Sequence, residues 1–265
     1  MFRQQFSDRD MNDDQCLRRL RFRKDIMTEL CNILQAELES QTLVMTALSV
    51  ASKVTFALNF YATGSFQAAT VDMFNISQFA TYTSIREITD ALYWRKANYI
   101  SFPMTREKQL ERQTAFLRIT DFPRVQGVID CTHLALGAPQ QTPEQFRNRK
   151  GFLSLNVQLV CDHNRKIMEV DARFPGSSHD SFILHQSSLP RLFTGTNEDC
   201  GWLLGDKGYA LSTWLMTPLR NPRSAGQVAY NESLTATRSI IEHTFGILKQ
   251  RFRCLDHSGC AAVLT

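Results

Sequence analysis

The spacing of apolar residues changes near residue 110, and this change limits the folds that the chain can adopt. Before it, apolar side chains recur at helical spacing, and the stretch 17–110 is predicted to be helical. After it come three strand-like runs, a helix, a fourth strand and a last helix. This order is typical of a mixed α/β domain. We therefore predict a helical region over 1–110 and an α/β domain over 111–265.

The helical region resembles a helix-turn-helix arrangement. A long helix over 43–61 should end at Gly64, which can take the left-handed conformation. A short helix over 66–74 and a turn should follow, with Ser77 as the N-cap of a third helix over 78–93. That third helix is poor in positive charge for a DNA reader. An ordinary helical packing domain therefore fits this region as well as a DNA-reading one does.

The α/β domain has a recognisable succession of elements. Its predicted strands cover 124–129 with 134–136, 152–161, 167–173 and 201–205. Its predicted helices cover 181–193 and 237–252, with a loop over 217–231 between the last strand and the last helix.

Composition and charge narrow the class of protein. No apolar run approaches the roughly 18 residues of a membrane span, and the first residues lack the apolar core of a secretory signal. The seven cysteines are scattered and odd in number, so we expect reduced thiols and an intracellular protein. Between residues 207 and 253 there are seven basic and two acidic residues, which indicates either a footprint for a polyanion or a solvated charged face.

Four acids stand where elements are predicted to begin or end, or on the last helix: Asp130, Asp180, Asp206 and Glu242. Buried carboxylates are costly unless they are paired or bind a cation. Several of them converging would form a site for a hard cation such as Mg²⁺ or Mn²⁺, because these ions prefer oxygen ligands. Taken singly, each acid also fits an ordinary role as a helix cap, a turn residue or an ion-pair partner.

One face of the last helix combines an acid with several cations. At about 100° per residue, Arg238, Glu242, Gly246, Lys249 and Arg253 fall within roughly 40° of one line. We predict that Arg238, Lys249 and Arg253 contact a nucleic-acid backbone while Glu242 binds the ion. A row of surface charges of little energetic value is the alternative.

Four motifs follow one another in the second half of the chain: GVIDCTH (127–133), FPGSSHDS (174–181), LLGDKGY (203–209) and RSIIEHTFGILKQRFRCL (238–255). Together they resemble the motifs of the PIF/Harbinger transposase superfamily, which includes nucleases derived from Harbinger transposases. The stretch FALNFYATGSFQ (56–67) is similar to the helical region of such nucleases. The resemblance runs from about residue 20 to the end of the sequence.

The resemblance implies a ribonuclease-H-like domain with a DDE metal centre. Asp130 matches the first acid, on the central strand, Asp206 the second, after the fourth strand, and Glu242 the third, on a later helix. These three would be catalytic, and Asp180 would join them as a metal ligand. Two Mg²⁺ or Mn²⁺ ions roughly 3.5–4 Å apart would activate water and stabilise the leaving oxygen of a phosphodiester.

The resemblance also implies a biological setting. It points to a DNA endonuclease without transposase activity, found in the nucleus and cytoplasm, that works with a Myb-like DNA-binding partner. Members of the family continue past the RFRCL segment with a further helix, so we expect either a shortened form of the sequence or a catalytic domain that lacks a supporting element at its C-terminus. The alternative function is a non-catalytic nuclear DNA-associated adaptor that works with the same kind of partner.

Overall fold

The computed structural model describes residues 11–38, 48–64, 76–137, 143–195 and 200–256. Contacts divide the chain into two compact units. One unit holds the described residues up to Tyr99 together with those from Leu248 onward, and the other runs from Ile100 to Ile247. These units differ from the predicted ranges 1–110 and 111–265, because the last helix contributes its end to the helical unit.

The helical unit is built from α1 (Asp13–Leu20), α2 (Lys24–Leu38), α3 (Val50–Thr63), α5 (Gln78–Tyr99) and the short 3₁₀ helix η2 (Arg253–Leu255). The start of the predicted helical stretch is interrupted at Arg21, whose left-handed conformation (φ 62°) ends α1. Fully buried apolar side chains from all four of these α-helices form the core, among them Leu20, Leu34, Val54 and Ile88. Their burial against one another supplies the main favourable free energy of this unit.

Two predicted helix ends in this unit are confirmed. The Ser77 hydroxyl accepts a hydrogen bond from the Ala80 amide (3.1 Å), as an N-cap does. Gly64 ends α3 at φ 61°, where a β-carbon would lie 3.0 Å from the Arg253 carbonyl oxygen, so glycine is required. The predicted short helix over 66–74 lies outside the described residues, and the helix-turn-helix arrangement stays a prediction.

The sheet unit is a mixed α/β structure around five strands, β1 (Val125–Ala135), β2 (Ser154–Cys161), β3 (Ile167–Pro175), β4 (Trp202–Leu204) and β5 (Leu215–Met216). The strand order is β3-β2-β1-β4-β5. The first three strands pair antiparallel, whereas β4 pairs parallel with β1 and β5 with β4. β1 is therefore the central strand, and the two runs predicted on either side of residues 130–133 are one continuous strand.

The helices of this unit are α6 (Arg106–Thr120), α7 (Pro143–Phe146), α8 (Asp180–Gln186), α9 (Leu189–Thr194) and α10 (Ala225–Arg251). The helix predicted over 181–193 is two helices, α8 and α9. The last helix begins at Ala225, well before the predicted residue 237, because Ser224 caps it by accepting from the Gln227 amide (3.3 Å). Among the helices that the structure describes, none combines the length and hydrophobicity needed to cross a membrane.

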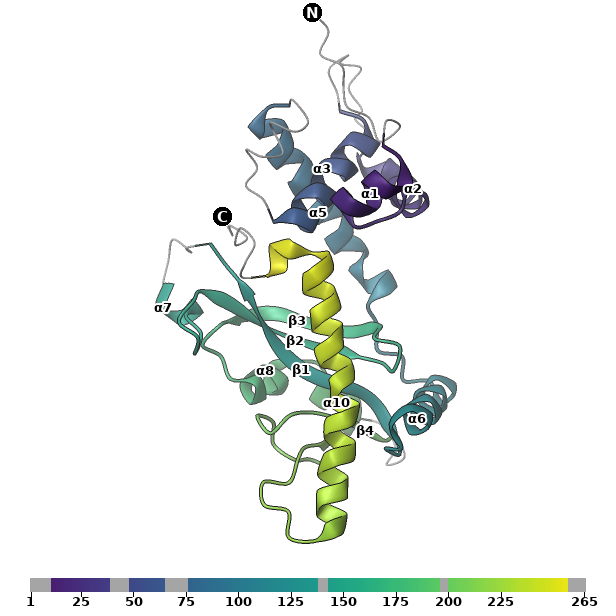
Figure 1. Cartoon of the computed structure of the whole chain (residues 1–265), viewed down its shortest axis with the longest axis vertical. Helices are drawn as coiled ribbons and strands as arrows, with labels where there is room; N and C mark the ends of the chain where they lie inside the picture. The colour runs from purple at the N-terminus through teal and green to yellow at the C-terminus, as the bar shows by residue number, and fades with distance from the viewer. Residues whose placement is uncertain (1–10, 39–47, 65–75, 138–142, 196–199, 257–265) are drawn as a thin grey trace, which may run out of the picture. The chain divides into compact units, whose positions relative to one another are not determined.

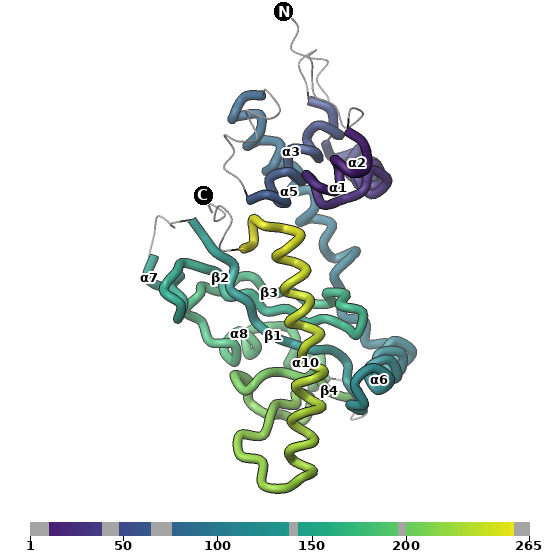
Figure 2. Tube along the Cα trace, in the orientation of Figure 1, coloured from purple at the N-terminus to yellow at the C-terminus, as the bar shows by residue number. Residues whose placement is uncertain are grey.

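The two faces of β1 meet different helices. Ile129 packs in a core with residues of α8 and α9, such as Leu184 and Phe193. The next residue, Asp130, points to the opposite face and contacts α10, which crosses β1 in Figure 1 and in the trace of Figure 2. Because successive side chains of a strand point to opposite faces, Asp130 faces α10 although the strand around it is buried.

Candidate active site

The three predicted aspartates stand on three elements of the sheet unit. Asp206 follows β4 after one residue, Gly205, and Asp180 is the first residue of α8, as expected. Asp130 lies in the middle of β1, so the expectation that it ends a strand is wrong. The pairing of β1 with β4 brings the end of β4 next to Asp130, because Val128 is in register with Leu204.

Asp206 and Asp180 meet around Gly208. The Gly208 amide donates to the Asp206 Oδ1 atom (2.8 Å), which orients this carboxylate. A β-carbon on Gly208 would lie 2.9 Å from Asp206 Oδ1 and 3.3 Å from Asp180 Oδ2. Glycine at this position therefore leaves a small space that is bordered by two carboxylates.

Asn156 on β2 holds Asp180, and the sequence analysis did not identify it. Its side-chain amide donates to Asp180 Oδ1 and to the Ser178 carbonyl oxygen, both at 2.9 Å. Asn156 is buried, and its Oδ1 atom has no hydrogen-bond partner among the residues that the structure describes. The available signal was a lone asparagine within the apolar run 152–161, where an amide is costly unless it is hydrogen-bonded.

Asp130 forms an ion pair with Arg238 of α10. The Arg238 Nη2 atom lies 2.7 Å from Asp130 Oδ2, and the two side chains are only 13% and 16% exposed. The same nitrogen lies 3.9 Å from Glu242 Oε1, whose side chain is 60% exposed. One guanidinium therefore contacts the first and the third of the predicted catalytic acids.

The environment of Asp130 changes its acidity. Burial, with a smaller contribution from the nearby charge of Asp206, raises its pKa from 3.8 to about 6. The positive charge of Arg238 and a hydrogen bond from the Cys131 amide (2.8 Å) act in the opposite direction. Asp130 is thus ionised near neutral pH but is easier to protonate than an exposed aspartate.

Cys131 and Tyr209 form a buried pair beside the carboxylates. The Cys131 Sγ and Tyr209 Oη atoms are 3.2 Å apart. Burial raises the pKa of both groups well above their usual values, and the charge of Asp180 adds to the rise in each. Cys131 therefore stays a thiol at neutral pH, which does not suit a nucleophile.

The predicted line of cations on the last helix is only partly present. Arg238 is paired with Asp130, so its side chain faces the sheet. Helix α10 ends at Arg251, and Arg253 lies on η2, so the expected alignment of Arg253 along one helix is wrong. Lys249 lies on α10, and by their contacts both Lys249 and Arg253 belong to the helical unit. The nucleic-acid contacts of these three residues stay a prediction.

The carboxylates of the predicted site suit a hard divalent cation, although the described side chains are not grouped closely enough to hold one. In the described part of the chain, no group of three or more histidine, cysteine or acidic side chains stands close enough to hold an ion. The groups around Gly208 and Arg238 are nonetheless carboxylate oxygens, the ligands that Mg²⁺ and Mn²⁺ prefer. The residues fit such ions chemically, provided that Arg238 leaves Asp130.

Comparisons with known proteins show a family and several relatives to which the chain is similar. Residues 129–262 match the model of a family described as DDE superfamily endonuclease. The human protein called "Putative nuclease HARBI1" is 38% identical over 249 residues, which cover 94% of this chain and 71% of the human protein.

The relatives extend beyond mammals. The HARBI1 protein of Xenopus laevis is 36% identical over 249 residues, covering 94% of this chain and 72% of its own. An Arabidopsis thaliana protein called "Protein ALP1-like" is 24% identical over 226 residues, covering 79% and 55%. No solved structure shows a significant match to the chain.

Proposed function

The chain belongs to the DDE superfamily endonucleases and is a relative of the HARBI1 proteins, and on this premise we propose that it is a divalent-metal-dependent DNA endonuclease. It hydrolyses phosphodiester bonds and does not carry out transposition. The catalytic residues are Asp130, Asp206 and Glu242, and Asp180 joins them as a metal ligand. The observation that carries this proposal is the arrangement of three aspartates from separate elements around Gly208 and Arg238.

A ribonuclease-H-like fold of the sheet unit belongs to the same proposal. It is supported by the strand order β3-β2-β1-β4-β5, in which three antiparallel strands continue into parallel pairs. It is also supported by the positions of the acids, which lie on the central strand, after β4 and on a later helix. These are the positions that the family resemblance implies for the three acids.

The carboxylates of Asp130, Asp206, Asp180 and Glu242 would hold Mg²⁺ or Mn²⁺. When bound, such ions supply an activated water for attack on phosphorus and stabilise the leaving oxygen. Asn156 fixes Asp180 with one hydrogen bond, and the Gly208 amide fixes Asp206 with another. Arg238 forms the close ion pair with Asp130 and lies near Glu242, and with a bound ion in its place it would be free to contact phosphate.

DNA binding and cellular setting complete the proposal. Lys249 and Arg253 would contact the DNA backbone, and their loss should weaken binding to all sequences alike. Partnership with a Myb-like DNA-binding protein and residence in nucleus and cytoplasm are proposed from the family resemblance.

One observation favours a second function, a non-catalytic DNA-associated adaptor. The Arg238 guanidinium already compensates Asp130, so the sheet unit does not need a metal ion to satisfy this buried charge. A chain that kept this pair permanently would still present its fold to DNA and to a partner protein.

Cleavage of supercoiled plasmid DNA in Mg²⁺ or Mn²⁺ separates the two functions. We expect nicked and linear products from the wild type and at least about a hundredfold less from Asp130→Ala and from Glu242→Ala, because each change removes a metal ligand. Glu232→Ala on the same helix is the matched control and should cleave normally. Absence of cleavage by well-folded wild-type protein in both metals would favour the adaptor.

A further inference from the structure

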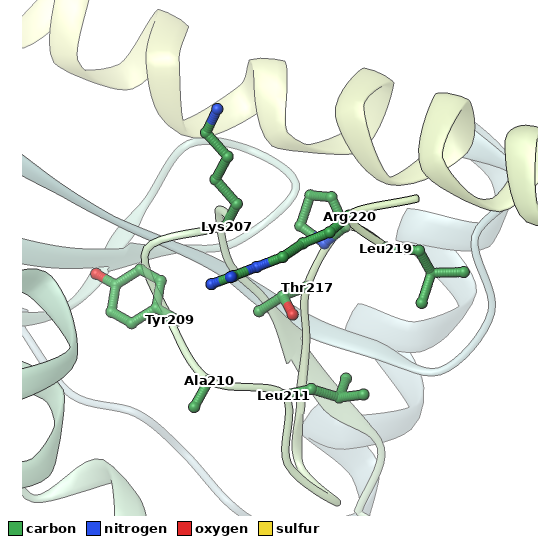
Figure 3. Close-up of a pocket in the computed structure, with 8 residues that line it drawn as sticks. Lys207, Tyr209, Ala210, Leu211, Thr217, Leu219 and Arg220 are labelled. Carbon is green, nitrogen blue, oxygen red and sulfur yellow. The ribbon is translucent and has the colours of Figure 1, made fainter. Parts of the chain in front are cut away.

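A pocket of about 230 Å³ lies next to Asp206 along the chain. The loop from Lys207 to Leu211, which follows β4, forms one side, and the segment from Thr217 to Arg220, which follows β5, forms the other (Figure 3). Since a water molecule takes up about 30 Å³ in the liquid, the pocket has room for a ligand much larger than a single ion.

Helix α10 holds one wall of the pocket in place. The Tyr230 hydroxyl donates to the Thr217 carbonyl oxygen (2.9 Å). The Asn231 side chain bonds both backbone groups of Leu219, accepting from its amide at 2.8 Å and donating to its carbonyl oxygen at 2.9 Å. These three bonds fix the segment after β5, so this wall exists before any ligand binds.

Tyr209 in the opposite wall connects the pocket with β1. Tyr209 is 4% exposed, and its hydroxyl contacts the Cys131 thiol of β1. Figure 3 shows this hydroxyl pointing away from Arg220 and the side chains of the second wall. The tyrosine thus lines the pocket on one side and contacts, on the other, the residue that follows Asp130.

Two cations stand at the pocket, and no described acid pairs with either of them. Lys207 and Arg220 are both exposed. In Figure 3 Lys207 extends toward α10, and Arg220 reaches across the pocket toward the loop that holds Lys207 and Tyr209. The sequence from 207 to 231 contains no aspartate or glutamate, so this stretch presents only positive charge.

The combination of charge and apolar surface selects the class of ligand. Unpaired lysine and arginine side chains bind phosphate oxygens strongly. The side chains of Leu211 and Leu219 offer apolar surface of the kind against which a sugar or a base can pack. An inorganic anion would satisfy the cations but would leave this apolar surface unused.

We propose that this pocket binds one nucleotide of a DNA strand, with Lys207 and Arg220 on its phosphate and its base against the apolar walls. The inference rests on the proposed function, because it places this nucleotide next to the phosphate that the carboxylates would hold. The pocket would then fix the position of the strand relative to Asp206 and favour particular bases beside the cleavage point.

Binding of a fluorescein-labelled single-stranded tetranucleotide, measured by anisotropy in EDTA, tests the proposal without any cleavage. An abasic tetranucleotide with the same phosphates is the comparison ligand. The wild type should bind the base-containing strand several-fold more tightly than the abasic one, since only the base-containing strand can pack a base against the apolar walls. Equal affinity for the two strands would overturn the proposal.

Two sets of variants separate the base from the phosphate. Ala210→Trp adds a ring to the exposed rim of the pocket and should abolish the preference for bases, whereas Ala225→Trp, outside the pocket, should keep it. Lys207→Gln with Arg220→Gln should weaken binding of both strands and lower the salt slope by about 1 to 2. Arg223→Gln with Arg149→Gln, two exposed cations outside the pocket, is the matched control and should retain the base preference.

The outcomes distinguish this proposal from the proposed function. If Ala210→Trp binds both strands as the wild type does, or if the paired glutamine variant behaves like its control, the pocket does not bind a nucleotide. Asp130→Ala should keep the base preference in EDTA, even though it loses cleavage. A wild type that shows the preference but never cleaves plasmid would refute the nuclease and leave the pocket standing.

Discussion

The helical unit and the sheet unit bury different kinds of side chain. In the helical unit the core is apolar, and buried hydroxyls bond within their own helix, as Thr55 does to the Ala51 carbonyl oxygen (2.8 Å) and Ser84 to that of Ala80 (2.7 Å). In the sheet unit, buried amides and charges bond across elements, as Arg112 of α6 does to Gln126 of β1 (2.9 Å).

The difference shows in which unit the burial of polar side chains costs folding free energy. Removing a charged side chain from water costs several kcal/mol unless a partner compensates it. The helical unit keeps its ion pairs nearer the surface, whereas the sheet unit holds Asp130 and Arg238 largely buried beside two more aspartates. Buried charges whose acidity is changed gather at functional sites more often than elsewhere. The contrast therefore favours the sheet unit as the location of the proposed chemistry.

The largest effect is expected from breaking the buried ion pair with Arg238→Met. Methionine keeps part of the apolar stem but leaves Asp130 without its counter-charge, which should cost about 3–5 kcal/mol of unfolding free energy at about pH 8. The loss should shrink toward pH 5, where Asp130 takes up a proton instead, because its pKa is already raised to about 6. Urea unfolding followed by the fluorescence of Trp202 and Trp214 in a Trp94→Phe background measures it.

Divalent metal gives this variant a second readout. Mn²⁺ should raise the unfolding temperature of Arg238→Met more than that of the wild type, because the ion no longer competes with a guanidinium. Equal stability of variant and wild type at about pH 8, with equal responses to Mn²⁺, would contradict this description of the site.

In the helical unit, a substitution that creates a cavity in the apolar core should give a comparable loss of stability. Leu34 is fully buried, so Leu34→Ala should cost about 2–5 kcal/mol through lost burial and an unfilled space. Unlike Arg238→Met, this loss should hardly change between about pH 5 and pH 8, since no titrating group is involved. Urea unfolding monitored by far-ultraviolet circular dichroism at both pH values checks this, and a strong pH dependence would mean that the core is not purely apolar in its energetics.

A half-buried acid of the sheet unit, away from the four candidate acids, provides an intermediate effect. Burial, with the charge of Asp171, raises the pKa of Glu169 from 4.5 to about 7. The folded state thus holds this proton more tightly than the unfolded chain does, so stability is lost as pH rises from about 4.5 to 7. Glu169→Gln should remove that loss and stabilise the protein by about 1–3 kcal/mol at about pH 8, with little gain at pH 4.

Thermal unfolding across this pH range compares Glu169→Gln with the wild type. The exposed change Glu107→Gln serves as a control for removal of a charge. Parallel stability curves for Glu169→Gln and the wild type would show that Glu169 is not protonated in the fold near neutral pH.

The smallest effect is expected from an ion pair of the helical unit. Lys53 lies 2.8 Å from Glu87, whose side chain is 40% exposed. Glu87→Gln should cost at most about 1 kcal/mol, because water screens a partly exposed pair. Denaturation at low and high salt measures it, and a cost like that of Arg238→Met would remove the contrast between the units.

Much of the fold follows from local patterns in the sequence. The alternating run 152–161 and the run 167–173 predict β2 and β3, and the short apolar run before Asp206 predicts β4. Helix α6 was not predicted, because its buried positions include Gln109 and Arg112 and so break the apolar periodicity. The two-residue strand β5 is too short to leave a pattern.

The candidate site likewise contains residues that the sequence predicts and residues that it does not. The four acids could be identified because motifs and element ends mark them. The pairing of Arg238 with Asp130 could not, because helical periodicity places residues on a face without showing what that face packs against. Asn156 and Gly208 likewise gain their importance from β2 and the β4–β5 loop meeting α8 in space.

Crystallographic location of Mn²⁺ by its anomalous scattering tests the central claim most directly. We expect an anomalous peak within coordination distance of oxygens from Asp130 and Asp206, with the Arg238 guanidinium moved away from Asp130. Saturating Mn²⁺ with no peak among these carboxylates, and with Arg238 still paired to Asp130, would contradict the account.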